Sequence, residues 1–326
     1  MNTRIALYAL AHRYRLDSRA TQALFLAAGL DREPAGLVRR FWPAVAIIAA
    51  ALGGLGVILW LAANWETLGR VGRFALLQGA VLVFCTGAAL RPGLRAPLGL
   101  LALLCIGGLF AYFGQTYQTG ADPWQLFALW AALALPLCLG VRSDVLWAPW
   151  ALVTMTAVSL WTYAHTGHRW SVQPEDLRTF LMAWSSAALL VIFLGPAARR
   201  FTGAGDWALR VAATLTVIGI TLAGLGALFH NKVAAHYPLA LTVFALAALV
   251  LASSRAFDVF VLSAVTLGLN TLLVAGLARL LFEGSSGDSM GRLLLIGLVA
   301  AGLVAASVSL ITRLARRGHG GEEVPA

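Results

Sequence analysis

Ten polar and aromatic residues flank two apolar segments of the sequence and could form one binding site. They are Asn64, Trp65, Glu66, Arg70, Arg73, Gln115, Tyr117, Gln118, Asp122 and Trp124. Guanidinium, amide and carboxylate groups beneath an aromatic rim suit a lipid headgroup or a small polar ligand. An alternative is an intramembrane enzyme that acts at the outer leaflet through Glu66 or Asp122. A third interpretation is structural: these residues cap helix ends and anchor the interface, with Glu66 paired to Arg70 or Arg73.

The spacing of these residues places several of them on common helix faces. If the chain stays helical past Asn64, then Glu66, Arg70 and Arg73 lie at i, i+4 and i+7 and share one face. Gln115 and Gln118, at i and i+3, would likewise share a face.

The composition determines the class of protein that carries this cluster. The chain has 326 residues, of which 60% are hydrophobic and 12% charged, with a mean hydropathy of +0.81. Soluble domains are about half apolar and about a quarter charged, so a soluble globular protein is excluded. The 24 basic and 14 acidic residues give a net charge of +10. Many of these basic residues lie in the connections between membrane-spanning segments, where they orient the protein. We therefore expect contact with the lipid bilayer and no nucleic-acid partner.

Ten uncharged windows, each about long enough to cross a bilayer, predict an all-α integral membrane protein with about ten transmembrane helices. The residues that bound these windows are 40–66, 73–91, 95–122, 122–142, 144–165, 178–199, 210–230, 232–255, 258–279 and 292–313. The second and eighth windows are the weakest. The predicted domains are a helical arm at 1–42, a polytopic domain at 43–313 and a disordered cytoplasmic tail at 314–326.

The basic residues predict the orientation of these helices. With a cytoplasmic N-terminus, 17 of the 24 basic residues fall on the inner side and seven on the outer side. An even number of helices also places both termini in the cytoplasm. The first and third helices then run outward, which brings the ten candidate residues to the outer leaflet.

The arm at residues 1–42 is predicted to be a small helical hairpin on the cytoplasmic surface. Asp17 or Ser18 can cap a second helix that runs to Gly29, and Pro34 suits the first turn of a third. The arm carries a net charge of +4, which suits contact with anionic headgroups, although a partner-docking helix is an alternative. It has no apolar signal-peptide region, so we expect no cleavable leader.

The windows lack the groups that transport and catalysis in membranes usually need. None contains an Asp, Glu, Lys or Arg, and no nucleotide-binding, metalloprotease or nucleophile-elbow motif occurs. We therefore expect no enzymatic activity, no cofactor and no metal site. Gln78 and Asn270 are predicted to form interhelical hydrogen bonds. His165, His168, His230 and His236 fall on predicted outer loops. His165 and His168 would lie one helical turn apart, but the spacing of His230 and His236 is not a standard zinc-ligand spacing.

Two motifs resemble the DUF2157 family of bacterial predicted membrane proteins. The first is the helix end Ala62-Ala63-Asn64-Trp65, and the second is Gly114-Gln115-Thr116-Tyr117-Gln118. The resemblance extends over residues 1–165, including the helical region before the first span. It implies a bacterial inner-membrane location and no known biochemical activity.

Two functional hypotheses remain ahead of the enzyme. The first is a non-enzymatic scaffold or partner subunit of an envelope complex, which the absence of buried charge favours. The second is a carrier or flippase for a neutral or lipid-like substrate, which ten spans and a polar outer site favour. A carrier needs a polar cavity that reaches the middle of the membrane, whereas a scaffold does not.

Overall fold

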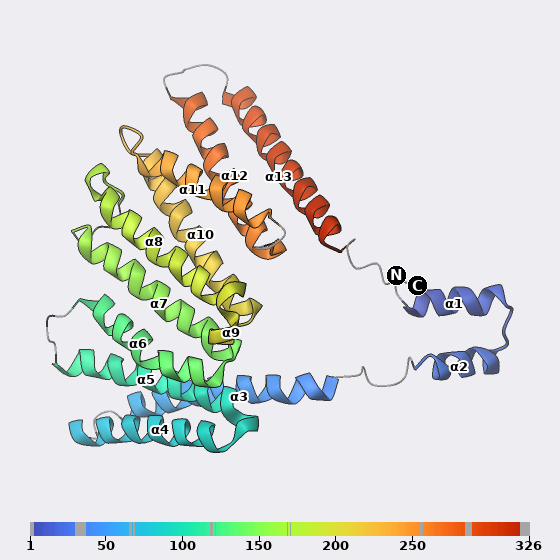
Figure 1. Cartoon of the computed structure of the whole chain (residues 1–326), viewed down its shortest axis with the longest axis horizontal. Coiled ribbons are helices and arrows are strands. Elements are labelled where there is room, and N and C mark those ends of the chain that lie inside the picture. Colours follow the sequence, from blue (N-terminus) through green and yellow to red (C-terminus); the bar gives the residue numbers. More distant parts are fainter. Residues whose placement is uncertain are drawn as a thin grey trace. The chain divides into compact units, whose positions relative to one another are not determined.

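A computed structural model describes most of the chain, and the described part contains helices and no strands (Figure 1). The described residues are 3–29, 37–64, 67, 69–117, 120, 122–167, 169, 171–253, 257–283 and 289–319. They separate into two compact units, residues 1–52 and residues 53–326, which are treated individually below.

The first unit begins with the predicted helical hairpin. Its helices are α1 (Thr3–Arg13) and α2 (Ser18–Ala27), whose Tyr8 and Phe25 rings lie 4.9 Å apart. Asp17 caps α2 as expected, because its Oδ1 accepts a hydrogen bond of 2.7 Å from the Ala20 N–H. The predicted role of Pro34 lies outside the described residues.

Each of the ten predicted windows coincides with a helix. These are α3 (Leu37–Ala63), α4 (Arg70–Leu90), α5 (Arg95–Tyr117), α6 (Pro123–Val141), α7 (Asp144–His165), α8 (Leu177–Leu194), α10 (Asp206–Leu228), α11 (His236–Leu251), α12 (Val259–Phe282) and α13 (Ser289–His319). Among the described residues, nine of these helices are long and apolar enough to cross a membrane. The prediction of an all-α polytopic membrane protein is confirmed.

The tenth helix, α11, differs from the others in length. It has 16 residues, which at 1.5 Å per residue span about 24 Å, against a bilayer core of about 30 Å. The eighth window loses its first residues to the connection from Lys232 to Ala235, so only part of its apolar length is helical. Passage of α11 through the whole membrane therefore stays a prediction.

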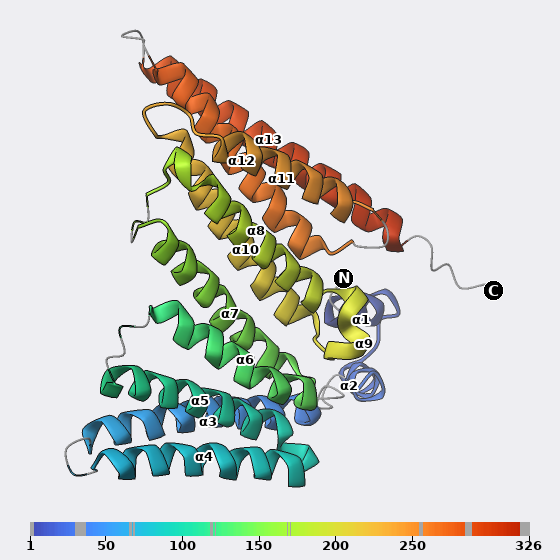
Figure 2. The same ribbon diagram turned by 60° about the vertical axis from the view of Figure 1, so that its left-hand side comes forward.

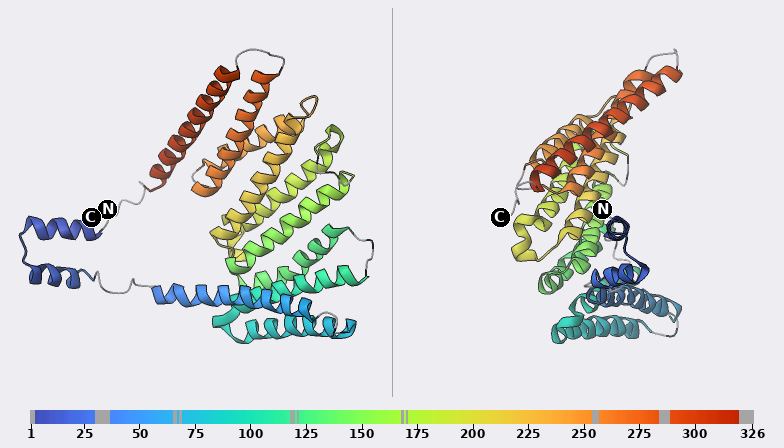
Figure 3. Two further views of the ribbon diagram at one scale, coloured as in Figure 1. Left: turned by 180° about the vertical axis from the view of Figure 1, so that it is seen from behind. Right: turned by 90° about the vertical axis from the view of Figure 1, so that its right-hand side faces the viewer.

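In the second unit the helices pack mainly against their neighbours in the sequence, from α4 to α13 (Figure 2). Helix α10 lies in the middle and packs against α7, α8, α11 and α12, while the main partner of α13 is α12. Figure 3 shows from behind that α4 and α13 lie at opposite ends of this row. Both helices are little buried, so their apolar side chains face the lipid or another protein.

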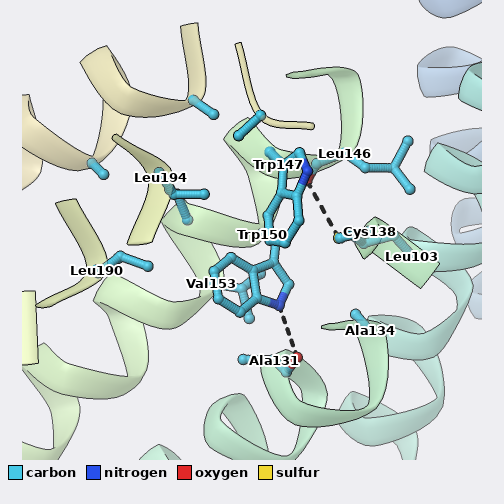
Figure 4. Close-up of a cluster of buried hydrophobic side chains, with 14 residues drawn as sticks. Leu103, Ala131, Ala134, Cys138, Leu146, Trp147, Trp150, Val153, Leu190 and Leu194 are labelled. Carbon is cyan, nitrogen blue, oxygen red and sulfur yellow. Dashed lines mark hydrogen bonds between the residues drawn. The ribbon is translucent and has the colours of Figure 1, made fainter. Parts of the chain in front are cut away.

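The larger of the two main cores centres on two tryptophans of α7 (Figure 4). The rings of Trp147 and Trp150 lie 5.2 Å apart, edge to face. Their indole N–H groups donate to the carbonyls of Thr202 at 2.9 Å and Ala131 at 2.8 Å, so neither buried donor lacks a partner. Small side chains around them, such as Ala134 and Ala208, let the helices approach closely.

A carboxylate of α7 closes the start of α10. Gly205 precedes α10 and has no side chain with which to cap it. Instead, Asp144 accepts hydrogen bonds from the backbone N–H of Gly205 at 2.5 Å and of Trp207 at 3.0 Å. A negative charge at a helix N-terminus is favourable, so this contact fixes α10 beside α7.

We predict that Gly107→Ala destabilises the packing of α5 against α6. A Cβ at position 107 would lie 2.3 Å from the Trp130 ring, whose Nε1 is tied to the Leu103 carbonyl at 3.0 Å. The ring can yield only by moving a helix or breaking this bond, which we expect to cost about 1–3 kcal/mol. Thermal unfolding in detergent measures the loss. Gly79→Ala is the matched control because nothing lies within 4 Å of its added Cβ, and equal stability of the two variants would contradict the prediction.

Candidate functional site

The first part of the predicted site follows the end of α3. The Asn64 side chain donates to the Trp60 carbonyl at 2.9 Å, and Thr67 donates to the Asn64 carbonyl at 2.9 Å. The Trp60 carbonyl also accepts from the Asn64 backbone N–H at 3.0 Å, so the Asn64 side chain gives it a second hydrogen bond. The Thr67 hydroxyl satisfies the Asn64 carbonyl, which the helix end leaves free. Asn64 therefore has a structural role at the helix end, whereas Trp65 and Glu66 lie outside the described residues.

The condition for a shared face of Glu66, Arg70 and Arg73 is not met. Helix α3 ends at Ala63 and α4 begins only at Arg70, with Gly69 as its extended N-cap residue. Arg70 and Arg73 still share a face, since both belong to the first turn of α4.

Arg70 and Arg73 lie over two tyrosines of α5. The Arg70 guanidinium carbon is 5.8 Å from the centroid of the Tyr117 ring, and that of Arg73 is 5.9 Å from the Tyr112 ring. Phe74 adds ring contacts of 4.6 Å to Tyr112 and 6.0 Å to Tyr117. These five residues form the α4–α5 cluster, in which cation–π contacts hold two arginines at the end of the helix pair.

Tyr112 and Phe74 did not appear among the predicted site residues. A signal was available, because Phe74 follows Arg70 and Arg73 on the same helical face. Tyr112 is one of the few buried polar aromatics, which its place within a long apolar window concealed.

The remaining predicted residues do not all join the α4–α5 cluster. Gln115 is exposed near the end of α5, and Gln118 lies outside the described residues. Asp122 is the N-cap residue of α6, and its carbonyl accepts from Gln125 at 3.0 Å. Trp124 instead contacts α7, with its ring 6.2 Å from that of His165, which in turn lies 4.5 Å from Trp161.

The structure thus provides arginine donors, aromatic rings and helix-end amides at one end of α4, α5 and α6. These groups can bind an anion or a polar headgroup by hydrogen bonds and stacking. In the described part of the chain, no group of three or more His, Cys, Asp or Glu residues could hold a metal ion. A ligand at this site stays a prediction.

Residues 9–147 match the DUF2157 family model, whose description is a predicted membrane protein. The resemblance seen in the two motifs is confirmed over this stretch, which contains all ten predicted site residues and the α4–α5 cluster. The DUF2157 match ends near the start of α7, so α8 to α13 lie beyond it. No curated protein and no solved structure matches the chain.

One polar group of the second half was placed wrongly on an exposed outer loop. His236 begins α11 and is fully buried, with its ring 5.0 Å from Phe180 and without a hydrogen-bond partner for either ring nitrogen. Pro238, which suits the first turn of a helix, was the signal for this helix start.

Arg279, in the last turn of α12, donates to the His230 carbonyl at 2.9 Å and to the Glu283 carboxylate. The hydrogen bond to Glu283 lowers the pKa of that carboxyl group.

We predict that Arg70 and Tyr117 are energetically coupled. Arg70→Gln and Tyr117→Leu should each destabilise the protein slightly, and the double variant should lose about 0.5–1 kcal/mol less than the sum of both losses. Unfolding by a denaturing detergent measures the three free energies.

Arg91, at the opposite end of α4, provides the control cycle. Arg91→Gln combined with Tyr117→Leu should be additive, because the two side chains are separated by most of the helix. Additivity in the Arg70 cycle as well would mean that the stacked geometry contributes nothing to stability.

Proposed function

We propose that the protein is a non-enzymatic subunit of a complex in a bacterial inner membrane, where its lipid-facing helices dock another membrane protein. One observation carries this proposal: Gln78, in the middle of α4, is exposed and has no hydrogen-bond partner among the described residues. An amide within the hydrocarbon core needs a partner, and polar side chains on a neighbouring helix are the usual ones.

The surface around Gln78 supports this proposal. Only 11% of the residues in the apolar stretch of α4 are buried, and nothing lies within 4 Å of a Cβ added to the adjacent Gly79. A glycine beside a polar residue lets a second helix approach the backbone closely, which strengthens both van der Waals contact and hydrogen bonding.

Helix α13 presents a second face of this kind. Gly297, Ala301, Ala305 and Ser309 recur every four residues and are all exposed. Its other face is held by α12, where the Asn270 amide donates to the Ser307 hydroxyl at 2.9 Å. This bond is the interhelical role expected for Asn270, and it leaves the small-residue face open to a partner.

The alternative, a carrier or flippase, is supported only for a lipid-like substrate. A cavity of about 730 Å³ opens between α6, α7 and α8, but its lining is mostly Ala, Leu, Val and Trp. The hydroxyls of Thr154 and Ser186 in this lining already donate to backbone carbonyls of their own helices. This lining disfavours a carrier for a polar substrate, and a lipid-like substrate is the form of the alternative that it fits.

We predict that Gln78→Leu weakens the assembly of this protein with its partner. Loss of one interhelical hydrogen bond, about 0.6–2 kcal/mol, corresponds to about a three- to thirtyfold lower association constant. Native mass spectrometry of protein extracted gently from its own membrane measures the fraction in assemblies heavier than the 34.5 kDa chain.

Gln125→Leu is the control for this experiment, because Gln125 is also exposed but lies in the first turn of α6. Ala301→Leu tests the α13 face in the same way. Monomeric protein in every sample would contradict the proposal, and an assembly of this chain alone would replace the complex by a homo-oligomer.

The proposed orientation, with both termini in the cytoplasm, predicts which single cysteines react from outside. A cysteine at Glu175 or Asn231 should react with a membrane-impermeant maleimide in intact cells, and one at Gly93 or Ser253 only after permeabilisation. All four positions are exposed and lie between helices. The pair Asn231 and Ser253 flanks α11, so equal labelling of both from outside would show that α11 does not cross the membrane.

A further inference from the structure

The cavity between α6, α7 and α8 has the location and lining of a lipid-binding groove. It has a volume of about 730 Å³ and reaches from Trp124 and Trp161 near one end of the helices to Ala131, Thr154 and Leu189 deeper in the membrane. This volume lies in the range of small-molecule sites. The three helices lie next to one another in the row, with α7 packed against both α6 and α8 (Figure 2).

The chemistry of the groove favours a hydrocarbon chain over a polar molecule. Its walls are largely apolar, and the hydroxyls of Thr154 and Ser186 donate to the carbonyls of Trp150 and Met182 at 2.9 and 2.8 Å. These two hydroxyls therefore present no free donor to a ligand, whereas the exposed Ser185 hydroxyl has no acceptor among the described residues. The side chains on the α8 wall, among them Met182 and Leu189, are exposed, so the groove is open sideways to the bilayer.

A cation lies above the mouth of the groove. Arg178, in the first turn of α8, precedes Met182, Ser185 and Leu189 at helical spacing, so it shares the face that lines the cavity. From Arg178 to Leu189 this face runs about 16 Å along the helix at 1.5 Å per residue. A headgroup beside Arg178 can therefore extend its chain along the groove.

Arg178 is available to an anion from outside the chain. Two carboxylates precede it, but within the described residues neither Glu175 nor Asp176 lies within ion-pair distance of its guanidinium.

Trp124 lies at the same end. It lines the cavity, and its indole N–H is buried and has no acceptor among the described residues. Tryptophans near helix ends lie at the headgroup level of a bilayer, which is also where ester and phosphate oxygens lie.

We propose that this groove binds one phosphate-bearing membrane lipid, with a hydrocarbon chain between α6 and α8 and the phosphate at Arg178. Bulk lipid would fill any apolar groove in a bilayer, so apolar contact alone gives little preference. The charged contact at the mouth is what favours a phosphate-bearing lipid over a lipid without a phosphate, such as diacylglycerol. This site is separate from the α4–α5 cluster and from the surfaces proposed to dock a partner.

Photo-crosslinking of the full-length protein in vesicles of phosphatidylethanolamine and phosphatidylglycerol tests the proposal. The probes are a phosphatidylglycerol and a diacylglycerol that carry the same diazirine-bearing acyl chain, and peptide mass spectrometry locates the labelled helix. We expect labelling of α7 and α8 peptides by the phosphatidylglycerol probe. Arg178→Gln should reduce this labelling about fivefold, the effect of one basic residue near a membrane surface, and leave diacylglycerol labelling unchanged.

Two variants block the groove itself. Ser185→Phe places a ring in the cavity from the exposed α8 wall, and Ala128→Leu narrows the α6 wall, so both should reduce labelling by either probe. The controls are Ser263→Phe, on an exposed part of α12, and Lys232→Gln, an exposed cation away from the groove.

Three results would overturn the proposal. They are unchanged labelling in both blocking variants, equal phosphatidylglycerol labelling in Arg178→Gln and the wild type, and competition by millimolar inorganic phosphate. The last result would identify a simple anion site instead of a lipid site. Circular dichroism of each variant verifies that it has folded, and the blocking variants on two different helices keep the test decisive if one of them misfolds.

Discussion

The arrangement of the second unit depends on how the start of α10 is satisfied. A helix that enters a bilayer leaves four N–H groups without intrahelical partners, and lipid offers none. Gly205 cannot cap the helix itself, so Asp144 reaches across from α7 and accepts from two of these groups. A Cβ at Gly205 would lie 2.5 Å from the Asp144 carboxylate, so this cap requires both the acid and the glycine. Helix α10 packs against four other helices. The positions of α8, α11 and α12 therefore depend on this contact.

The buried indole groups of the core also need hydrogen-bond partners. Trp147 and Trp150 are large enough to fill the space between α6, α7 and α8 near the N-terminal end of α7, yet each carries a donor that must be paired. Their partners, the carbonyls of Thr202 and Ala131, come from the short α9 (Arg199–Thr202) and from α6. The tryptophans therefore determine both the distance between these helices and their register. A side chain of equal volume without the N–H would keep the distance between the helices but lose their register.

Sequence patterns predicted the elements better than their contacts. The charge-free windows located all ten helices, because insertion into lipid imposes a length and composition that are visible residue by residue. They overstated α11, since an apolar run does not reveal where its helix begins; the buried His236 and the following Pro238 mark that start. The stacking of Arg70 on Tyr117 joins residues 47 positions apart, and only packing reveals such a pair. The same holds for the groove, whose walls come from three helices.

The surfaces of this protein differ in whether their polar groups find hydrogen-bond partners within the same helix. Hydroxyls such as Thr154 and Ser186 return to their own backbone, which makes the groove beside them effectively apolar. The Gln78 amide cannot be satisfied in this way, because it carries both donors and an acceptor, and one backbone carbonyl cannot pair with all of them. The proposed protein partner therefore rests on an exposed amide in the membrane interior, whereas the proposed lipid rests on an apolar groove beneath an exposed arginine. The first depends on hydrogen bonds that lipid chains cannot make, and the second on a charge that the surrounding headgroups can match.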